Sequence, residues 1–252
     1  MNYRTHRALL AAVALASAAA PLAQLAAKPS SAAAVVADPG RSEKHRKLDE
    51  GRMPAEILAF TAVKPGETVI DYISGSGYYA ELFARAVGPK GIVYAVNPET
   101  FHNPKDFEPI LARRTNLRVL VAPATSLQLA PRSVDTLFTH LNYHDLCWES
   151  EKFKFPRIDV PAVLAGWFQA VRPGGQVVII DHVGPAGDPR VVADQLHRID
   201  PERVKADMAA AGFVLEAESA VLRRSEDDHT KGVFDPSLRG KTDRFVLKFR
   251  RP

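Results

Sequence analysis

Short apolar runs alternate with longer amphipathic runs along most of the chain. At residues 68–87, alternating apolar and β-branched positions predict a buried strand, Gly75 and Gly77 predict a turn, and apolar positions at helical spacing predict a helix. Strand-length apolar runs follow at 92–96, 117–121, 134–139 and 176–183, and helical patterns lie at 54–62, 105–114, 160–171 and 201–211. Strands that alternate with helices predict a doubly wound α/β sheet.

The chain ends differently from the way it begins. Two strand-like runs, 213–222 and 244–250, follow each other without a helix between them, which predicts an antiparallel edge to the sheet. The polar connection at 223–243 is too long for a simple hairpin. It could fold as a lid over a substrate mouth or pack against the edge of the domain.

Composition and charge limit the function. A chain of 252 residues with 46% hydrophobic and 25% charged residues can bury one good core. The formal net charge of +4 falls to about +2 if Arg4 and Arg7 are removed with a leader. No basic run is interleaved with aromatic residues, so we expect no nucleic-acid partner. The single Cys147 excludes an internal disulfide and a cysteine zinc cluster.

The N-terminus predicts export. Residues 1–27 combine a basic start, a short apolar run and small residues at cleavage positions, the layout of a secretory signal peptide, with the cut after Ala20, Ala27 or Ala37. No cysteine follows the apolar run, which excludes a lipoprotein, and an uncleaved membrane anchor remains the alternative. We expect a periplasmic or secreted protein without stable membrane insertion after cleavage.

The next segments are predicted to connect this leader to the domain. Residues 28–40 are rich in Ala, Ser and Pro and are expected to form a disordered linker. A single domain is expected over 41–252, entered through the charged stretch 41–52, which we interpret as a solvated helical or irregular segment.

The glycine turn permits two cofactor interpretations. Gly75-x-Gly77-x-x-Ala80 satisfies the dinucleotide-binding pattern, which also requires an acidic residue at the end of the second strand, where Asn97 stands. An S-adenosylmethionine fold uses the same turn and ends its sheet with an antiparallel pair. The Arg172-Pro-Gly-Gly turn before the fifth strand and the helix-free final pair favour S-adenosylmethionine.

Several motifs carry a family resemblance from about Arg52 to Pro252. They are MPAEILAF, DYISGSGYY, VYAVNPE, LNYHD, RPGGQVVIIDH, LHRIDPERVKADMAAAGF and DDHTKGVFDPSLRGKTDRFVLKF. The chain resembles a family of exported class I methyltransferases with a Rossmann-like fold. The resemblance implies a mostly parallel seven-stranded sheet with an antiparallel C-terminal strand, helices on both faces, and S-adenosyl-L-methionine as cofactor. It implies no particular substrate.

The resemblance also implies which residues bind the cofactor. Asp71 would orient the loop and the cofactor's amino group, Asn97 would face the ribose, and the remaining contacts would come from Ser74, Gly75, Gly77, Tyr78, Ala124 and Thr125. Tyr79 could equally be a packing residue. The sequence departs from the general pattern at Ile73, where glycine is usual, and at Asn97, where an acid is usual.

Catalytic candidates follow the fourth strand. Asn142, His144 and Asp145 emerge at the carboxyl edge of the sheet, where open α/β folds bind ligands. We expect His144, oriented by Asp145, to remove a proton from the methyl acceptor, and Asn142 to contact the cofactor or polarise the acceptor. Alternatively, His144 caps a helix or bonds the backbone.

No metal site is expected. His140 and His144 are four residues apart, but the segment follows a strand, so the spacing does not place them on one helix face. Asp181-His182 and His229 could reach the same mouth, whereas His197 and Arg198 suit surface or salt-bridge roles.

The combined interpretation is an S-adenosylmethionine-dependent methyltransferase acting on an unidentified small molecule. Two alternatives remain: a catalytically inactive exported binding module on the same scaffold, and a nicotinamide-dependent oxidoreductase. Export leaves the supply of cofactor unexplained.

Overall fold

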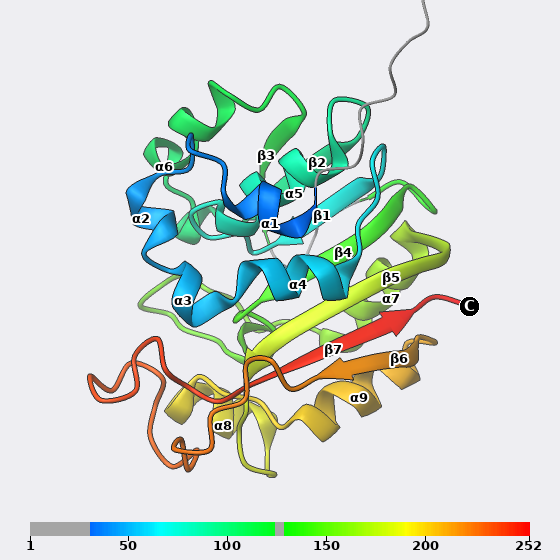
Figure 1. The fold of residues 1–252 in the computed structure, drawn as a ribbon. Coiled ribbons are helices and arrows are strands. Elements are labelled where there is room, and N and C mark those ends of the chain that lie inside the picture. The colour runs from blue at the N-terminus through cyan, green and yellow to red at the C-terminus, as the bar shows by residue number, and fades with distance from the viewer. Residues whose placement is uncertain (1–30, 124–128) are drawn as a thin grey trace, which may run out of the picture.

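One mixed sheet organises the molecule. A computed structural model describes residues 31–123 and 129–252, and within them the strands form a seven-stranded sheet of order β3-β2-β1-β4-β5-β7-β6 (Figure 1). The strands are β1 (Thr68–Tyr72), β2 (Ile92–Asn97), β3 (Leu117–Val121), β4 (Val134–His140), β5 (Val171–His182), β6 (Val214–Ser219) and β7 (Arg244–Arg250). Neighbours from β3 to β5 pair in parallel, and β7 runs antiparallel between β5 and β6.

Helices cover both faces of the sheet. They are α1 (Ala32–Val36), α2 (Glu43–Arg46), α3 (Asp49–Arg52), α4 (Pro54–Thr61), α5 (Tyr78–Val87), η1 (Glu99–Phe101), α6 (Pro104–Leu111), η2 (His144–Cys147), α7 (Val160–Ala170), α8 (Pro189–Leu196) and α9 (Pro201–Ala210). Along β5, Val177 and Ile179 join the core with α7 and α9, whereas Val178 and Ile180 join the core with α4 and α5. The continuous apolar run of β5 is explained by this burial on two faces.

The predicted fold class is confirmed. The antiparallel position of β7 between β5 and β6 is the feature that the helix-free final pair of strands predicted. It also separates this sheet from the dinucleotide-binding order, in which the sixth strand lies directly beside the fifth. Helix α8 was missed, although Asp188 as N-cap and Pro189 in the first turn are a recognisable start signal.

The expected linker is structured in the part that the structure describes. Residues 32–36 form α1, where Val35 is buried against the core of α4 and α5. Asp38 forms ion pairs with Arg85 and Arg114. The expectation of disorder was therefore wrong for 31–40, because one apolar side chain and one carboxylate find partners that the local composition did not reveal. The leader at 1–27 lies outside the described residues.

The charged stretch 41–52 is helical over α2 and α3, as expected, but it is solvated only in part. Its exposed residues are Glu43, Lys44, Arg46, Lys47 and Glu50. Arg41 and His45 are buried, and Arg41 donates to Asp49 at 2.7 and 2.8 Å. His45 lies 3.2 Å from Glu81 on α5 and 3.3 Å from Ser76 of the glycine turn. Charged residues can be buried here because each one meets an opposite charge. The stretch therefore forms one wall beside the glycine turn.

Of the residues that the structure describes, none belongs to a helix long and apolar enough to span a bilayer.

Candidate active site

The glycine turn between β1 and α5 brings backbone to the carboxyl edge of the sheet. Gly75 and Gly77 adopt φ of 58° and 82°, a region that favours glycine. A Cβ on Gly77 would lie 2.8 Å from the Phe107 ring, whereas a Cβ on Gly75 would meet open space. The turn therefore packs on one side and leaves Gly75 facing a hollow.

Asp71 fixes the start of this turn. Its carboxylate is almost fully buried and accepts a 2.6 Å hydrogen bond from Ser74 Oγ. Burial raises the pKa of Asp71 to about 6, although the Ser74 hydroxyl, the Ala80 amide and the Arg52 charge oppose that rise. The position agrees with the loop-orienting role expected from the sequence.

Asn97 is used differently from the expectation. Its Oδ1 accepts from the Gly75 amide at 2.9 Å and its Nδ2 donates to the Gly75 carbonyl at 2.9 Å. The residue is fully buried, so its amide closes the turn in place of facing a ribose. An amide carries both a donor and an acceptor, which a carboxylate cannot match, and this explains why Asn stands here.

Ile73 does not plug the hollow. Its side chain belongs to the core that contains Tyr72 and Trp167, and it contributes only to the wall of the hollow. Its φ of 55° is unusual for a β-branched residue, and such a conformation costs roughly 1–2 kcal/mol. Burial of the side chain offsets that strain.

Asn142 joins the ends of β1 and β4. Its Nδ2 donates to the carbonyls of Ile73 at 2.8 Å and His140 at 2.7 Å. The two bonds hold the backbone of the hollow in place, so the amide nitrogen has a positioning role that sequence spacing did not predict. The hollow has a volume of about 180 Å³ and is lined also by Asp71, Ser74, Gly75 and Tyr78.

The two tyrosines that begin α5 pack their rings in the core and donate hydrogen bonds from their hydroxyl groups. Tyr78 Oη donates to Asp49 at 2.6 Å, and its ring lies 4.3 Å from the Arg52 guanidinium. Tyr79 packs on Phe138 and donates to the Arg52 carbonyl at 3.1 Å. Tyr79 is thus a packing residue, and Tyr78 lines the hollow while holding the preceding stretch against it.

His144 lies between two carboxylates in a second pocket. Its Nδ1 is 2.9 Å from Asp181 Oδ1, and its Nε2 is 3.5 Å from Asp145 Oδ1. Burial would lower the pKa of His144, but the negative charges of Asp181 and Asp145 outweigh it and raise the pKa to about 9. The imidazole therefore carries its proton at neutral pH.

This environment changes the role expected for His144. An imidazolium cannot accept a proton from an acceptor, so the structure does not supply a free base at this position at pH 7. The carboxylate that orients His144 most closely is Asp181, which also accepts from the His144 amide at 2.7 Å. Asp145 is the more distant partner, and burial raises its pKa to about 6.

One group of side chains has the spacing to hold a metal. Ligand atoms of His144, Asp145 and His197 lie within 4.8 Å of one another. Two imidazoles and one carboxylate suit a divalent transition metal. The expectation that the protein has no metal site stays a prediction.

Comparison with known proteins identifies the scaffold. No family model matches the sequence. An arsenite methyltransferase from Halobacterium salinarum is 29% identical over 157 residues, which cover 62% of this chain and only 36% of that protein. A SAM-dependent methyltransferase from Aquifex aeolicus superposes with a TM-score of 0.57 at 21% identity, over 83% of this chain and 97% of that chain. Geranyl diphosphate C-methyltransferase from Streptomyces coelicolor, in complex with Mg²⁺, geranyl diphosphate and S-adenosyl-L-homocysteine, gives a TM-score of 0.55 at 17% identity, over 87% and 88%.

The fold is that of S-adenosylmethionine-dependent methyltransferases. On this methyltransferase fold, the hollow lies at the carboxyl ends of β1 and β4, the edge at which open α/β sheets bind ligands. Of the residues expected to line it, Ala124 and Thr125 lie outside the described residues.

Three further residues line the pockets at this edge of the sheet. The sequence analysis did not single out Arg52 and Arg244, whereas it expected His182 to reach this edge. Arg52 lies beside the hollow, and Arg244 starts β7. His182 lies where two larger pockets meet, with its Nδ1 2.7 Å from Thr242 Oγ1. Burial and the neighbouring His144 charge hold the pKa of His182 well below its usual range, so this imidazole is neutral. The signal that led the sequence analysis to expect His182 here is its position at the end of the fifth strand.

Proposed function

We propose that this protein is a methyltransferase that uses S-adenosyl-L-methionine and a small-molecule acceptor. The observation that carries the proposal is the open hollow at Gly75, on a fold shared with such enzymes. A buried carboxylate, a glycine backbone and the amino end of α5 surround it. The weak likeness to an arsenite methyltransferase supports methyl transfer, but the match covers about a third of that relative.

The residues present fit the cofactor. Asp71 can hold the amino group of the methionine end, because its buried carboxylate gains a cationic partner there. Ser74 and Gly75 present backbone where it can be approached closely. The hollow of about 180 Å³ is small for a nucleoside, but a pocket of about 440 Å³ adjoins it and shares Leu141 and Asn142. Together they reach the range typical of ligand sites.

The protein's contribution to such a reaction would be alignment. When bound, S-adenosylmethionine supplies an electrophilic methyl group, and in-line placement of the acceptor provides much of the acceleration. Asn142 fixes the two strand ends that define the hollow. Because His144 already holds a proton, the reaction is best suited to an acceptor that needs no base, or to one served by the neutral His182.

Calorimetry with a pair of glycine variants tests this proposal. Gly75→Ala places a methyl group in the hollow, whereas Gly66→Ala places one in open space at the turn before β1. Both residues have positive φ, so both variants should lose roughly 1–2 kcal/mol of stability. We expect Gly75→Ala to weaken S-adenosylmethionine and S-adenosylhomocysteine binding at least tenfold, and Gly66→Ala to leave it unchanged.

Absence of binding by the folded wild-type protein would refute the enzyme proposal. Affinity for both compounds without turnover of any acceptor would favour the inactive binding module instead. Two features support that second candidate: the strained Ile73 and the closure of the turn by Asn97.

We also propose that the protein is exported. The support is the basic, apolar and small-residue layout of residues 1–27. N-terminal sequencing of the protein purified from its native cells should show a start after Ala20, Ala27 or Ala37. Retention of Met1 on a protein in the cytosolic fraction would refute export.

A further inference from the structure

A large cationic pocket adjoins the proposed cofactor hollow. Its volume is about 790 Å³, and it shares Arg52 and Leu141 with the hollow. Six cationic side chains line it against one carboxylate, Glu50. The cations are Lys47, Arg52, Arg224, Arg239, Lys241 and Arg244.

Arg244 forms the floor of this pocket. It is 4% exposed, its Nη1 donates to the Gly51 carbonyl at 2.8 Å, and its Nε donates to Thr242 Oγ1 at 3.1 Å. Within the described residues it has no ion pair, and its Nη2 has no hydrogen bond. A buried guanidinium is costly without a negative partner, so this position is arranged for one that comes from outside the chain.

Arg52 intensifies the positive charge. It is half-buried, lies 4.3 Å from the Tyr78 ring, and forms no ion pair with any residue that the structure describes. Burial, followed by repulsion from Arg52, lowers the pKa of Arg244 to about 10. Two guanidiniums that repel each other beside an open pocket are stabilised by a shared oxyanion, which each can bind through paired N–H groups.

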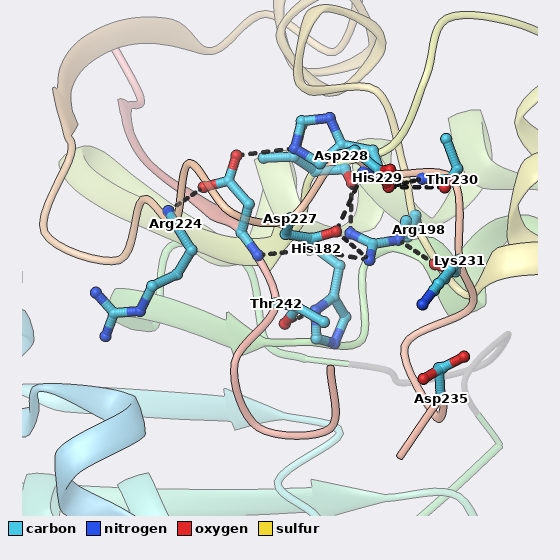
Figure 2. A network of polar contacts seen from close by, with 12 residues as sticks. His182, Arg198, Arg224, Asp227, Asp228, His229, Thr230, Lys231, Asp235 and Thr242 are labelled. Atoms are coloured by element: carbon cyan, nitrogen blue, oxygen red, sulfur yellow. Dashed lines mark hydrogen bonds and ion pairs between the residues drawn. The ribbon is translucent and has the colours of Figure 1, made fainter. Parts of the chain in front are cut away.

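The wall that carries Arg224, Arg239 and Lys241 is the long loop 223–243, and a buried network anchors it. The Arg198 guanidinium and the Asp227 carboxylate are fully buried and lie 2.9 Å apart (Figure 2). Asp243 accepts from the Arg224 amide at 2.7 Å, and the Arg224 side chain points away from that network (Figure 2). Because the loop is already held in place by these contacts, its cations line the pocket before any anion binds.

We propose that this pocket binds the anionic group of the methyl acceptor, a carboxylate or phosphate on a small molecule, and so places the acceptor beside the cofactor hollow. The assignment of the ligand as acceptor rests on the proposed methyltransferase function. The anion site itself rests on the pocket and on Arg52 and Arg244, which form no ion pair with any residue that the structure describes.

Calorimetric titration of the full chain with inorganic phosphate and with acetate tests the site, at an ionic strength held constant with sodium chloride. We expect the wild type to bind one of these anions, and Arg244→Gln to weaken that binding at least tenfold. Arg244→Lys should retain more affinity than Arg244→Gln, because it keeps the charge. Preference for phosphate would indicate a phosphorylated acceptor, and preference for acetate a carboxylate.

Arg250→Gln is the matched control. Arg250 lies on the same strand, is half-exposed, and does not line the pocket. It should bind the anion within twofold of the wild type. If Arg244→Gln fails to fold, Arg224→Gln replaces it. Arg224 is half-buried, and it lines this pocket but not the cofactor hollow. Equal affinity in the pocket variant and in Arg250→Gln, or no anion binding by the wild type, would overturn the proposal.

A parallel titration with S-adenosylmethionine separates the two proposals. Cofactor binding without anion binding removes the anion site and leaves the methyltransferase. Anion binding without cofactor binding removes the methyltransferase and leaves an anion-binding pocket on its fold.

Discussion

At the scale of single residues, partners decide what each side chain can do. Asn97 reads from the sequence as a ribose contact, yet both of its polar atoms are bonded to Gly75. His144 reads as a base, yet two carboxylates keep it protonated. The residue type was informative in both cases, but the hydrogen-bond partner determined the role.

Asp71 gives a residue-scale prediction about pH. Its folded pKa of about 6 lies above the ordinary value of 3.8, so the folded state holds the proton more tightly than the unfolded state. Stability from this group is thus greatest at low pH and is lost as pH rises from about 4 to 6, by roughly 2–3 kcal/mol. Asp71→Asn should remove this dependence, as measured by urea unfolding at several pH values.

Other groups titrate in the same range, so the useful quantity is the difference between wild type and Asp71→Asn. That difference should change between pH 4 and 6 and be constant above about pH 7. A difference that is constant over the whole range would show that Asp71 is not held protonated by its burial.

At the scale of elements, the ends of strands and one long loop build the site. The turn after β1, the end of β4 and the start of β7 all reach the same edge of the sheet. The sequence permits two roles for the loop 223–243, a lid over the site or a segment packed against the edge of the domain. The loop is anchored to the domain through Arg198 and Asp227, and it also forms a wall of the cationic pocket.

The anchor of this loop gives an element-scale prediction. Arg198→Gln leaves the Asp227 carboxylate buried without its partner, which should cost roughly 3–5 kcal/mol and expose 223–243 to limited proteolysis. Arg157→Gln removes an exposed ion pair with Glu149, whose side chains are 64% and 49% exposed, and should cost less than about 1 kcal/mol. Guanidinium unfolding of both variants measures the two costs, and equal values would contradict a structural role for the buried pair.

At the scale of the whole molecule, two cores share one sheet, and the segment before the sheet closes one of them. Val35 joins the core of α4 and α5, and Asp38 pairs with Arg85 and Arg114. The charged stretch that follows covers the glycine turn through His45. The N-terminal portion of the described chain is thus part of the domain, not a tether to it.

Two truncations test this at the scale of the molecule. A protein that starts at residue 41 loses the buried Val35 and the Asp38 ion pairs, and should be less stable by at least about 2 kcal/mol than one that starts at residue 31. Thermal and urea unfolding of the two proteins would show the difference. Identical unfolding free energies would show that residues 31–40 do not stabilise the domain and act as a linker.

The sequence by itself determined the succession of elements and the nature of the scaffold. Periodicity located the strands because β5 and its parallel neighbours are buried on both faces, and the strand pair without a helix indicated the antiparallel edge occupied by β7. The glycine turn was visible because only glycine adopts its backbone readily.

Only the tertiary structure decided the chemistry of the pockets at the carboxyl edge of the sheet. Arg52 and Arg244 are 192 positions apart in the numbering and share a pocket. His144 follows β4 and contacts Asp181 at the end of the neighbouring strand β5. Charge, pKa and hydrogen bonding depend on distances between groups that the chain brings together only on folding. For that reason the sequence predicted a cofactor site at the glycine turn, while the cationic pocket and the two carboxylates beside His144 became visible only in the structure.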